Sequence, residues 1–167
     1  IVCRALPREE TAASEQSENG APRFPKLRLA NQALHPLAEE AQRGYPVELD
    51  GVVTFSHPIH PVFFLNDASG GLCVNYDDTD LPRPASGDLA TVYGTTIAGG
   101  FATMVKASGL TINGRGPFPA VRSVTLEHAL TGVEAAQWVE LRGFLRQVEM
   151  RGGQAYLTVG AGCGESG

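Results

Sequence analysis

Apolar and polar residues alternate with a period of two through the middle of the chain, and this pattern predicts short β-strands. Residues 47–55 form the first such segment, with Val, Leu and Phe side chains on one face and mainly Glu, Asp and Thr on the other. Turn-forming residues separate further apolar runs, which cover 62–65, 72–75, 89–97 and 101–113. Five short strands that close on themselves leave no sheet edge exposed, so residues 45–116 are expected to form a β-barrel.

A helical pattern precedes the barrel. Within residues 24–44 we expect a short extended piece at 24–30 and one short helix at 37–43. Pro36 suits the first turn of that helix, and Gly44 suits its C-terminal end.

A second short helix is expected at residues 123–130, inside a linker that covers 117–136. Ser123 or Thr125 is able to cap the free amides at its start, and Gly132 is placed to end it. Such a helix would lie at one end of the barrel.

Part of the first predicted strand is repeated near the C-terminus. The segment Val47-Glu-Leu-Asp-Gly-Val-Val53 recurs as Val139-Glu-Leu-Arg-Gly-Phe-Leu145. Both copies carry a Gly where a first strand that serves two sides of a barrel must bend. We therefore expect residues 137–167 to be an incomplete second set of strands of the same design, and a chance match between two amphipathic strands is the alternative.

The N-terminal segment, residues 1–23, has the composition of a flexible leader. It is polar, rich in small residues and without an apolar period. Cys3 is not expected to carry a lipid, because Val2 is bulkier than the residue that usually precedes a lipoprotein cysteine. No run approaches the ~20 apolar residues of a membrane-spanning helix.

Composition supports an all-β class and narrows the choice of partners. The chain contains 20 Gly and 11 Pro, with 19% charged residues, which favours short strands and turns over a helical bundle. A formal net charge of −5 argues against nucleic acid, which is bound through clustered Lys and Arg. Three Cys without CxxC spacing indicate neither a disulfide framework nor a zinc site.

The candidate chemical groups do not assemble into a catalytic pattern. His57 and His60 could face one metal ion, but a rigid surface turn is the favoured interpretation of the His-Pro-Ile-His-Pro segment, because no nearby Cys or third His completes a ligand set. The acidic run at 77–80 lacks the Gly and distal Glu of a calcium loop. No Ser stands in a Gly-x-Ser-x-Gly elbow. We therefore expect no enzymatic activity, no metal and no cofactor.

Four segments together resemble an OB-fold module. These segments are Val47–Thr54, Phe63–Gly71, Gly87–Gly94 and Gln137–Gly143. They are similar to the extracytoplasmic barrel domains that precede the membrane and kinase parts of bacterial sensor histidine kinases and related signalling proteins. The resemblance implies an all-β, five-stranded OB-type barrel with short flanking helices and a partial second strand set. It also implies a periplasmic or secreted, non-catalytic sensing module whose partners are neighbouring domains of a longer polypeptide.

An OB barrel commonly binds its ligand over strands two and three and the loops beside them. The ligand-binding residues expected on this basis are His57, His60, Phe63, Asn75, Tyr76 and Phe101. The sequence does not identify a ligand: the module either binds a small molecule or transmits packing changes between neighbouring domains. Nucleic acid is not expected, since aromatic residues make up only 7% of the chain and stacking of single-stranded nucleic acid needs several. The alternative is an accessory OB-fold domain of a secreted nuclease, or a polysaccharide-binding module.

Overall fold

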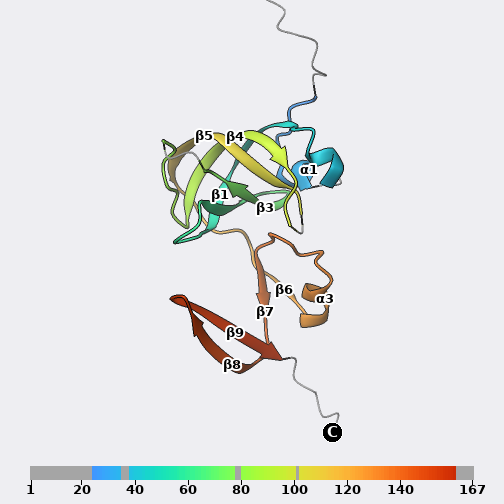
Figure 1. Cartoon of the computed structure of the whole chain (residues 1–167), viewed down its shortest axis with the longest axis vertical. Helices are drawn as coiled ribbons and strands as arrows, with labels where there is room; N and C mark the ends of the chain where they lie inside the picture. Colours follow the sequence, from blue (N-terminus) through green and yellow to red (C-terminus); the bar gives the residue numbers. More distant parts are fainter. Residues whose placement is uncertain (1–23, 35–37, 78–79, 101, 161–167) are drawn as a thin grey trace, which may run out of the picture.

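The computed structural model describes residues 24–34, 38–77, 80–100 and 102–160. Its main body is a closed barrel of five strands in the order β1-β2-β3-β5-β4 (Figure 1). The strands are β1 (Pro46–Ser56), β2 (Val62–Asp67), β3 (Gly70–Asn75), β4 (Asp88–Ile97) and β5 (Met104–Arg115). This order and closure are those of an OB-type barrel, so the predicted all-β class and architecture are confirmed.

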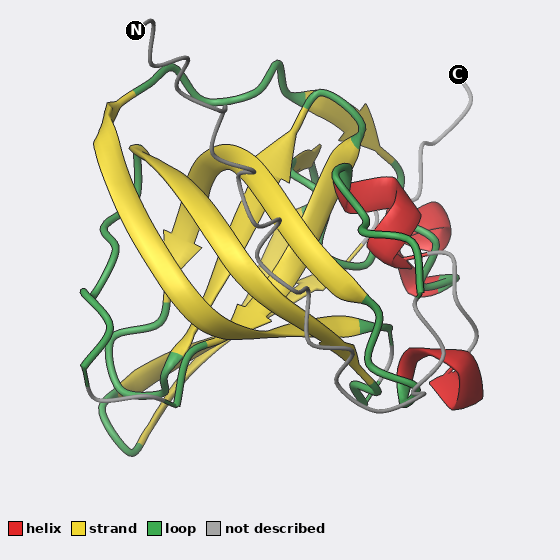
Figure 2. Cartoon of the chain, turned by 90° about the horizontal axis from the view of Figure 1, so that it is seen from above, coloured by secondary structure: helices red, strands yellow, loops and turns green. Residues whose placement is uncertain are grey.

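Closure of the barrel depends on β1 and on one parallel strand pair. β1 is antiparallel to both β2 and β4, and it therefore joins two sides of the barrel. On the opposite side β3 lies parallel to β5, with Val74 opposite Val105 and Asn75 opposite Lys106. Figure 2 shows the strands winding around a common interior.

A glycine and a bulge allow β1 to bend where the sequence predicts a bend. A Cβ atom at Gly51 would lie 2.4 Å from the carbonyl oxygen of Asn66 on β2, which is closer than any real side chain approaches. The pairing of β1 with β2 then shifts its register between Val53 and Phe55. Such a bulge increases local twist and helps a strand to curve around a barrel.

The barrel interior is filled by alternate side chains of the strands. Its buried apolar residues are Val47, Leu49, Val53, Phe63, Leu65, Leu72, Val74, Ala90, Val92, Val105, Ala107 and Leu110. Each fully buried Val, Leu or Phe contributes about 1.5–3 kcal/mol relative to an exposed position. Most of the hydrophobic core therefore lies inside the barrel.

The N-terminal helices differ from the prediction. Helix α1 spans Ala30–Leu34, where the sequence predicts only the end of an extended piece, and α2 spans Ala38–Ala41 inside the predicted helix at 37–43. The N–H of Ala30 donates to the Asp67 carboxylate over 2.7 Å, so a group from the β2–β3 turn caps α1. A cap from a distant turn leaves no local signal. Pro36 lies outside the described residues.

The C-terminal part contains two small sheets and one helix. Strand β6 (Arg122–Val124) pairs in parallel with β7 (Val139–Leu141), and β8 (Phe144–Arg151) forms a hairpin with β9 (Gln154–Gly160). The predicted helix at 123–130 is shorter, because its first two residues belong to β6.

Helix α3 (Leu126–Leu130) has the cap that the sequence suggests. The Thr125 side chain accepts a hydrogen bond from the His128 N–H. Gly132 follows the helix with a positive φ of 79°, as expected for a residue that ends a helix. None of the helices in the described part of the chain is long and apolar enough to cross a membrane. The predicted leader at 1–23 lies outside the described residues.

Candidate functional site

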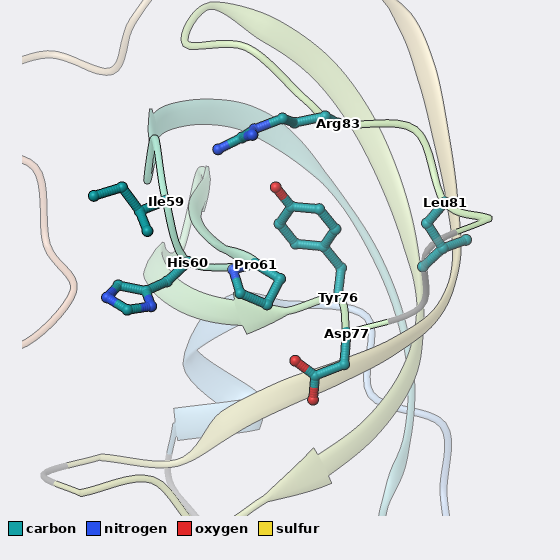
Figure 3. A pocket seen from close by; sticks show the side chains of 7 residues that line it. All are labelled: Ile59, His60, Pro61, Tyr76, Asp77, Leu81 and Arg83. Atoms are coloured by element: carbon teal, nitrogen blue, oxygen red, sulfur yellow. The ribbon is translucent and has the colours of Figure 1, made fainter.

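Two loops enclose a hollow of about 200 Å³ at one mouth of the barrel, here called the mouth hollow (Figure 3). Its lining residues are Ile59, His60, Pro61, Tyr76, Asp77, Leu81 and Arg83. They come from the β1–β2 loop and from the β3–β4 loop, which begins at Tyr76 directly after β3. The antiparallel pairing of β2 with β3, with Val62 opposite Asn75, brings these two loops together.

Hydrogen bonds within the β1–β2 loop fix the two histidines. The His57 Nδ1 accepts the N–H groups of Ile59 at 3.2 Å and of His60 at 3.0 Å. The two imidazole rings lie 4.6 Å apart between centroids. Of these two histidines, His60 lines the mouth hollow and His57 does not.

Arg83 braces this loop from the other side of the hollow. Its Nη2 donates to the His57 carbonyl oxygen over 2.7 Å and also to the Pro58 carbonyl oxygen. A single guanidinium group thus joins the β3–β4 loop to the β1–β2 loop, which preforms the hollow before any ligand binds. The sequence gives no sign of this role, since Arg83 lies in a proline-rich loop.

Tyr76 and Phe63 have different places in the site. The backbone N–H of Tyr76 donates to the Pro61 carbonyl oxygen over 2.9 Å, and its side chain points between the two loops (Figure 3). Phe63 is fully buried and packs its ring 5.5 Å from that of Tyr76. Phe63 therefore supports the tyrosine from inside the core and is not in a position to touch a ligand.

Asn75 lies beside the mouth hollow and fixes the start of the β3–β4 loop, which lines it. The Asn75 Oδ1 accepts the N–H of Asp77 over 3.0 Å, which sets the direction of the chain as it leaves β3. Of the residues expected from sequence, the structure thus brings His60 and Tyr76 into the hollow, with His57 and Asn75 next to it. Ile59 and Pro61 belong to the loop expected beside the site, whereas sequence reasoning missed Asp77, Leu81 and Arg83.

Phe101 lies outside the described residues, but its neighbours line a second hollow on the outer face of the barrel. This face hollow has a volume of about 260 Å³. Its lining is Phe64, Cys73, Gly100, Ala102, Thr103, Met104, Ala135 and Ala136. Burial in these apolar surroundings raises the pKa of the Cys73 thiol to about 11, so the thiol stays protonated at neutral pH.

Gln137 fastens the segment that covers the face hollow. Its side-chain amide accepts from the Gly71 N–H and donates to the Gly71 carbonyl oxygen, each over 3.1 Å. The amide thus reproduces the two hydrogen bonds of a neighbouring strand. A Cβ atom at Gly71 would lie 2.2 Å from the Ala136 carbonyl oxygen, so only glycine permits this approach.

The described residues offer no metal site. Among residues 24–34, 38–77, 80–100 and 102–160, no group of three or more His, Cys, Asp or Glu side chains could hold a metal ion. The chemical groups of the mouth hollow are instead one imidazole, one phenol, one carboxylate and one guanidinium, set among apolar side chains. Such groups can position a bound molecule by hydrogen bonds.

Comparison with known proteins gives only distant likenesses. No protein-family model matches the chain, and no curated protein matches it. A solved structure of the Stn1-Ten1 complex from S. pombe has 17% identity and a TM-score of 0.37, and covers 40% of this chain and 57% of its own. The hypothetical protein ygiW from E. coli has 14% identity and a TM-score of 0.42, and covers 58% of this chain and 99% of its own.

A third solved structure is the asparaginyl-tRNA synthetase of Entamoeba histolytica with bound asparaginyl-adenylate. It has 14% identity and a TM-score of 0.41, over 56% of this chain. This chain spans only 24% of that synthetase, and 57% of the S. pombe chain. The assignment to an OB-type barrel therefore stands on the order and closure of the chain's own five strands.

Proposed function

We propose that this chain is a non-catalytic binding module that holds a small molecule in the mouth hollow. The observation that carries the proposal is the Arg83 brace, which keeps the hollow formed by tying two loops of a closed barrel together. A preformed site avoids the cost of ordering loops when a ligand binds.

The lining of the hollow suggests the size and type of ligand. A volume of about 200 Å³ suits a compact solute better than a polymer segment. His60, Tyr76 and Asp77 offer hydrogen-bonding groups, while Ile59 and Leu81 offer apolar contact. We infer a small molecule with a polar group and an apolar part.

The proposal treats the chain as a binding protein and not as an enzyme. His57 Nδ1, the ring nitrogen closest to the loop backbone, is already an acceptor within the turn. Among the described residues the cysteine is Cys73, whose thiol is kept protonated at neutral pH by its raised pKa and lines the face hollow, whereas His60 lines the mouth hollow. These features favour binding over nucleophilic catalysis.

We extend the proposal to the setting of the module. The sequence resemblance supports an extracytoplasmic sensing domain of a bacterial signalling protein of the sensor histidine kinase type, with neighbouring domains of the same polypeptide as partners. In that setting, ligand binding at the barrel mouth would alter the contact between barrel and C-terminal hairpin. His57 Nε2 lies 3.2 Å from Gln154 Nε2 at the hairpin tip, which gives such a path.

Thermal shift and calorimetric titration with a panel of amino acids, small carboxylic acids and monosaccharides test the binding proposal. We expect at least one compound to bind the wild type, with affinity reduced about tenfold by His60→Ala and by Tyr76→Phe, each of which removes a polar contact worth about 1.4 kcal/mol. His128→Ala removes an imidazole outside the hollow and should leave affinity unchanged. Saturable binding of oligonucleotides or oligosaccharides, indifferent to His60 and Tyr76, would contradict the proposal.

A further inference from the structure

Two sequence motifs occur twice in the chain and in the same order. Phe24-Pro-Lys-Leu-Arg28 matches Phe118-Pro-Ala-Val-Arg122 at the Phe, Pro and Arg positions and at one apolar position. Val47-Glu-Leu-Asp-Gly51 matches Val139-Glu-Leu-Arg-Gly143. The Phe-Pro motif extends the repeat to Phe118, which lies in the segment predicted from sequence to be a linker.

The backbone around the two motifs is also repeated. Leu27 forms a parallel bridge with Val47, and Arg122 pairs in parallel with Val139. In each case a short helix, α1 or α3, follows the pairing residue before the chain returns as the strand with the Val-Glu-Leu motif. Parallel pairing across a helical connection is therefore a shared feature of both copies.

An aromatic pair stands at the same place in each copy. The ring of Phe24 lies 4.5 Å from that of Tyr45, and the ring of Phe118 lies 5.2 Å from that of Trp138. In both copies the phenylalanine begins the Phe-Pro motif and its partner immediately precedes the returning strand. The contact fixes the entry of the chain against the start of that strand.

The glycine of the second motif has the same steric role in both copies. A Cβ atom at Gly51 would lie 2.4 Å from the Asn66 carbonyl oxygen, and one at Gly143 would lie 2.8 Å from the Gly160 carbonyl oxygen. In each hairpin the residue after the glycine pairs with that same partner residue. Both glycines therefore permit close approach of the second strand.

The bulge is repeated as well. The register of β1 with β2 shifts between Val53 and Phe55, and that of β8 with β9 shifts between Leu145 and Gln147. Measured from the motif glycine, these are the same positions. A bulge at this point bends the strand toward barrel closure, so β8 carries the curvature of a barrel strand.

The β1–β2 hairpin and the β8–β9 hairpin differ in whether other parts of the chain cover their apolar faces. Val53 and Phe63 are fully buried in the barrel. Leu145 and Leu157 hold the equivalent register positions in the second hairpin, and they are 58% and 61% exposed. The face that is a barrel interior in the first copy is thus an exposed apolar face in the second.

The two faces of the second hairpin are clearly separated by chemistry. The exposed apolar face, here called the inner face, carries Leu145, Val148, Met150, Ala155, Leu157 and Val159. The outer face carries five polar side chains and two aromatic ones, which are Gln147, Glu149, Arg151, Gln154, Thr158, Phe144 and Tyr156. This is the alternation of a strand pair that buries one face against a core.

We propose that residues 118–160 are the first half of a second OB-type barrel. In this proposal the inner face of β8 and β9 binds three further strands of the same polypeptide, equivalent to β3, β4 and β5. In the first copy those three strands follow β2 directly after the turn at Ala68 and Ser69, and they bring Leu72, Val92 and Val105 into the core. Chain continuity in the first copy is the reason for choosing the same polypeptide as the source.

A grafted chain tests this proposal. Gly160 is equivalent to Asn66, so appending a duplicate of residues 67–115 after Gly160 supplies the equivalent strands in the order in which they follow β2. We expect the amides of β9 to exchange with solvent about 100-fold more slowly in the extended chain than in the 167-residue chain, because a free edge gains a hydrogen-bonded neighbour. Binding of the dye 1-anilinonaphthalene-8-sulfonate should fall in parallel.

Two adjacent residues provide the matched controls. In the extended chain, Leu157→Asp places a charge on the inner face and should abolish the new protection, whereas Thr158→Asp on the outer face should retain it. The amides of β1, recorded in the same spectra, should stay protected in every variant and show that the first barrel is folded.

The 167-residue chain offers a second measurement that needs no graft. We expect it to sediment as a monomer that binds the dye, with dye binding lowered several-fold by Leu157→Asp and unchanged by Thr158→Asp. A concentration-dependent dimer that protects β8 and β9 and is dissociated by Leu157→Asp would make a second copy the occupant and overturn the proposal. Equal exchange of β9 amides in the two chains would also overturn it.

Discussion

Gly51 shows how closely a single residue is tied to barrel closure. The strand that it interrupts must pass near β2, and the space for a side chain there is filled by the Asn66 backbone. Its sequence signal, a glycine inside an alternating strand, correctly predicts the bend. The neighbouring strand responsible for the close approach is known only from the structure.

Replacing this glycine should destabilise the barrel. Gly51→Ala forces a Cβ atom against the Asn66 carbonyl oxygen, and we expect the free energy of unfolding in urea to fall by about 1–3 kcal/mol. Gly100→Ala is the control, because a Cβ atom there meets no heavy atom within 4 Å. Equal stability of the two variants would contradict the close approach of β1 to β2.

The raised pKa of the buried Cys73 thiol should make the stability of the fold depend on pH in the alkaline range. Burial raises its pKa from 9.0 to about 11, so the folded protein holds this proton more tightly than the unfolded chain does. The stabilisation is fully present below pH 9.0 and is lost as pH rises from there toward about 11.

Urea unfolding across this pH range should reveal the effect. Wild type should lose more stability than Cys73→Ala between pH 9 and about pH 11, since other groups titrate equally in both proteins. Parallel pH curves for the two proteins would show that the thiol is not buried in the face hollow.

At the scale of elements, the sequence predicts the strands, but it does not predict the side-chain hydrogen bonds that join distant segments. All five barrel strands follow from alternation and turn residues, because those signals are local. Helix α1 was missed because its cap is the Asp67 carboxylate of a distant turn. Arg83 and Asp77 were not recognised as site residues, because their roles also depend on contacts with segments that are distant in the sequence. His60 and Tyr76 were predicted, because ligands of OB barrels commonly bind in this region.

The Arg83 brace should control the mobility of the β1–β2 loop. Arg83→Ala removes the donor to the His57 and Pro58 carbonyl oxygens, and the amides of Ile59 and His60 should exchange about tenfold faster. Arg83→Lys should restore only part of the protection, because an ammonium group lacks the planar fork of a guanidinium. The amide of Val53, inside the barrel, is the internal reference, and unchanged exchange in Arg83→Ala would exclude the brace.

At the scale of the whole molecule, the closed barrel determines where a ligand can bind. The mouth hollow lies where the β1–β2 loop meets the β3–β4 loop, because β2 and β3 pair with Val62 opposite Asn75. The small sheets and helix of the C-terminal part lie beyond the barrel, on the side from which the hairpin reaches His57 (Figure 1).

The most direct test is therefore the pairing of β3 with β5, observed by nuclear Overhauser effects between backbone protons in solution. The account predicts contacts in parallel register between Cys73 and Met104 and between Val74 and Val105, together with slow amide exchange on both strands. Fast-exchanging amides along β3 and β5 without cross-strand contacts would show an open sheet, and would contradict both the barrel and the binding site built on it.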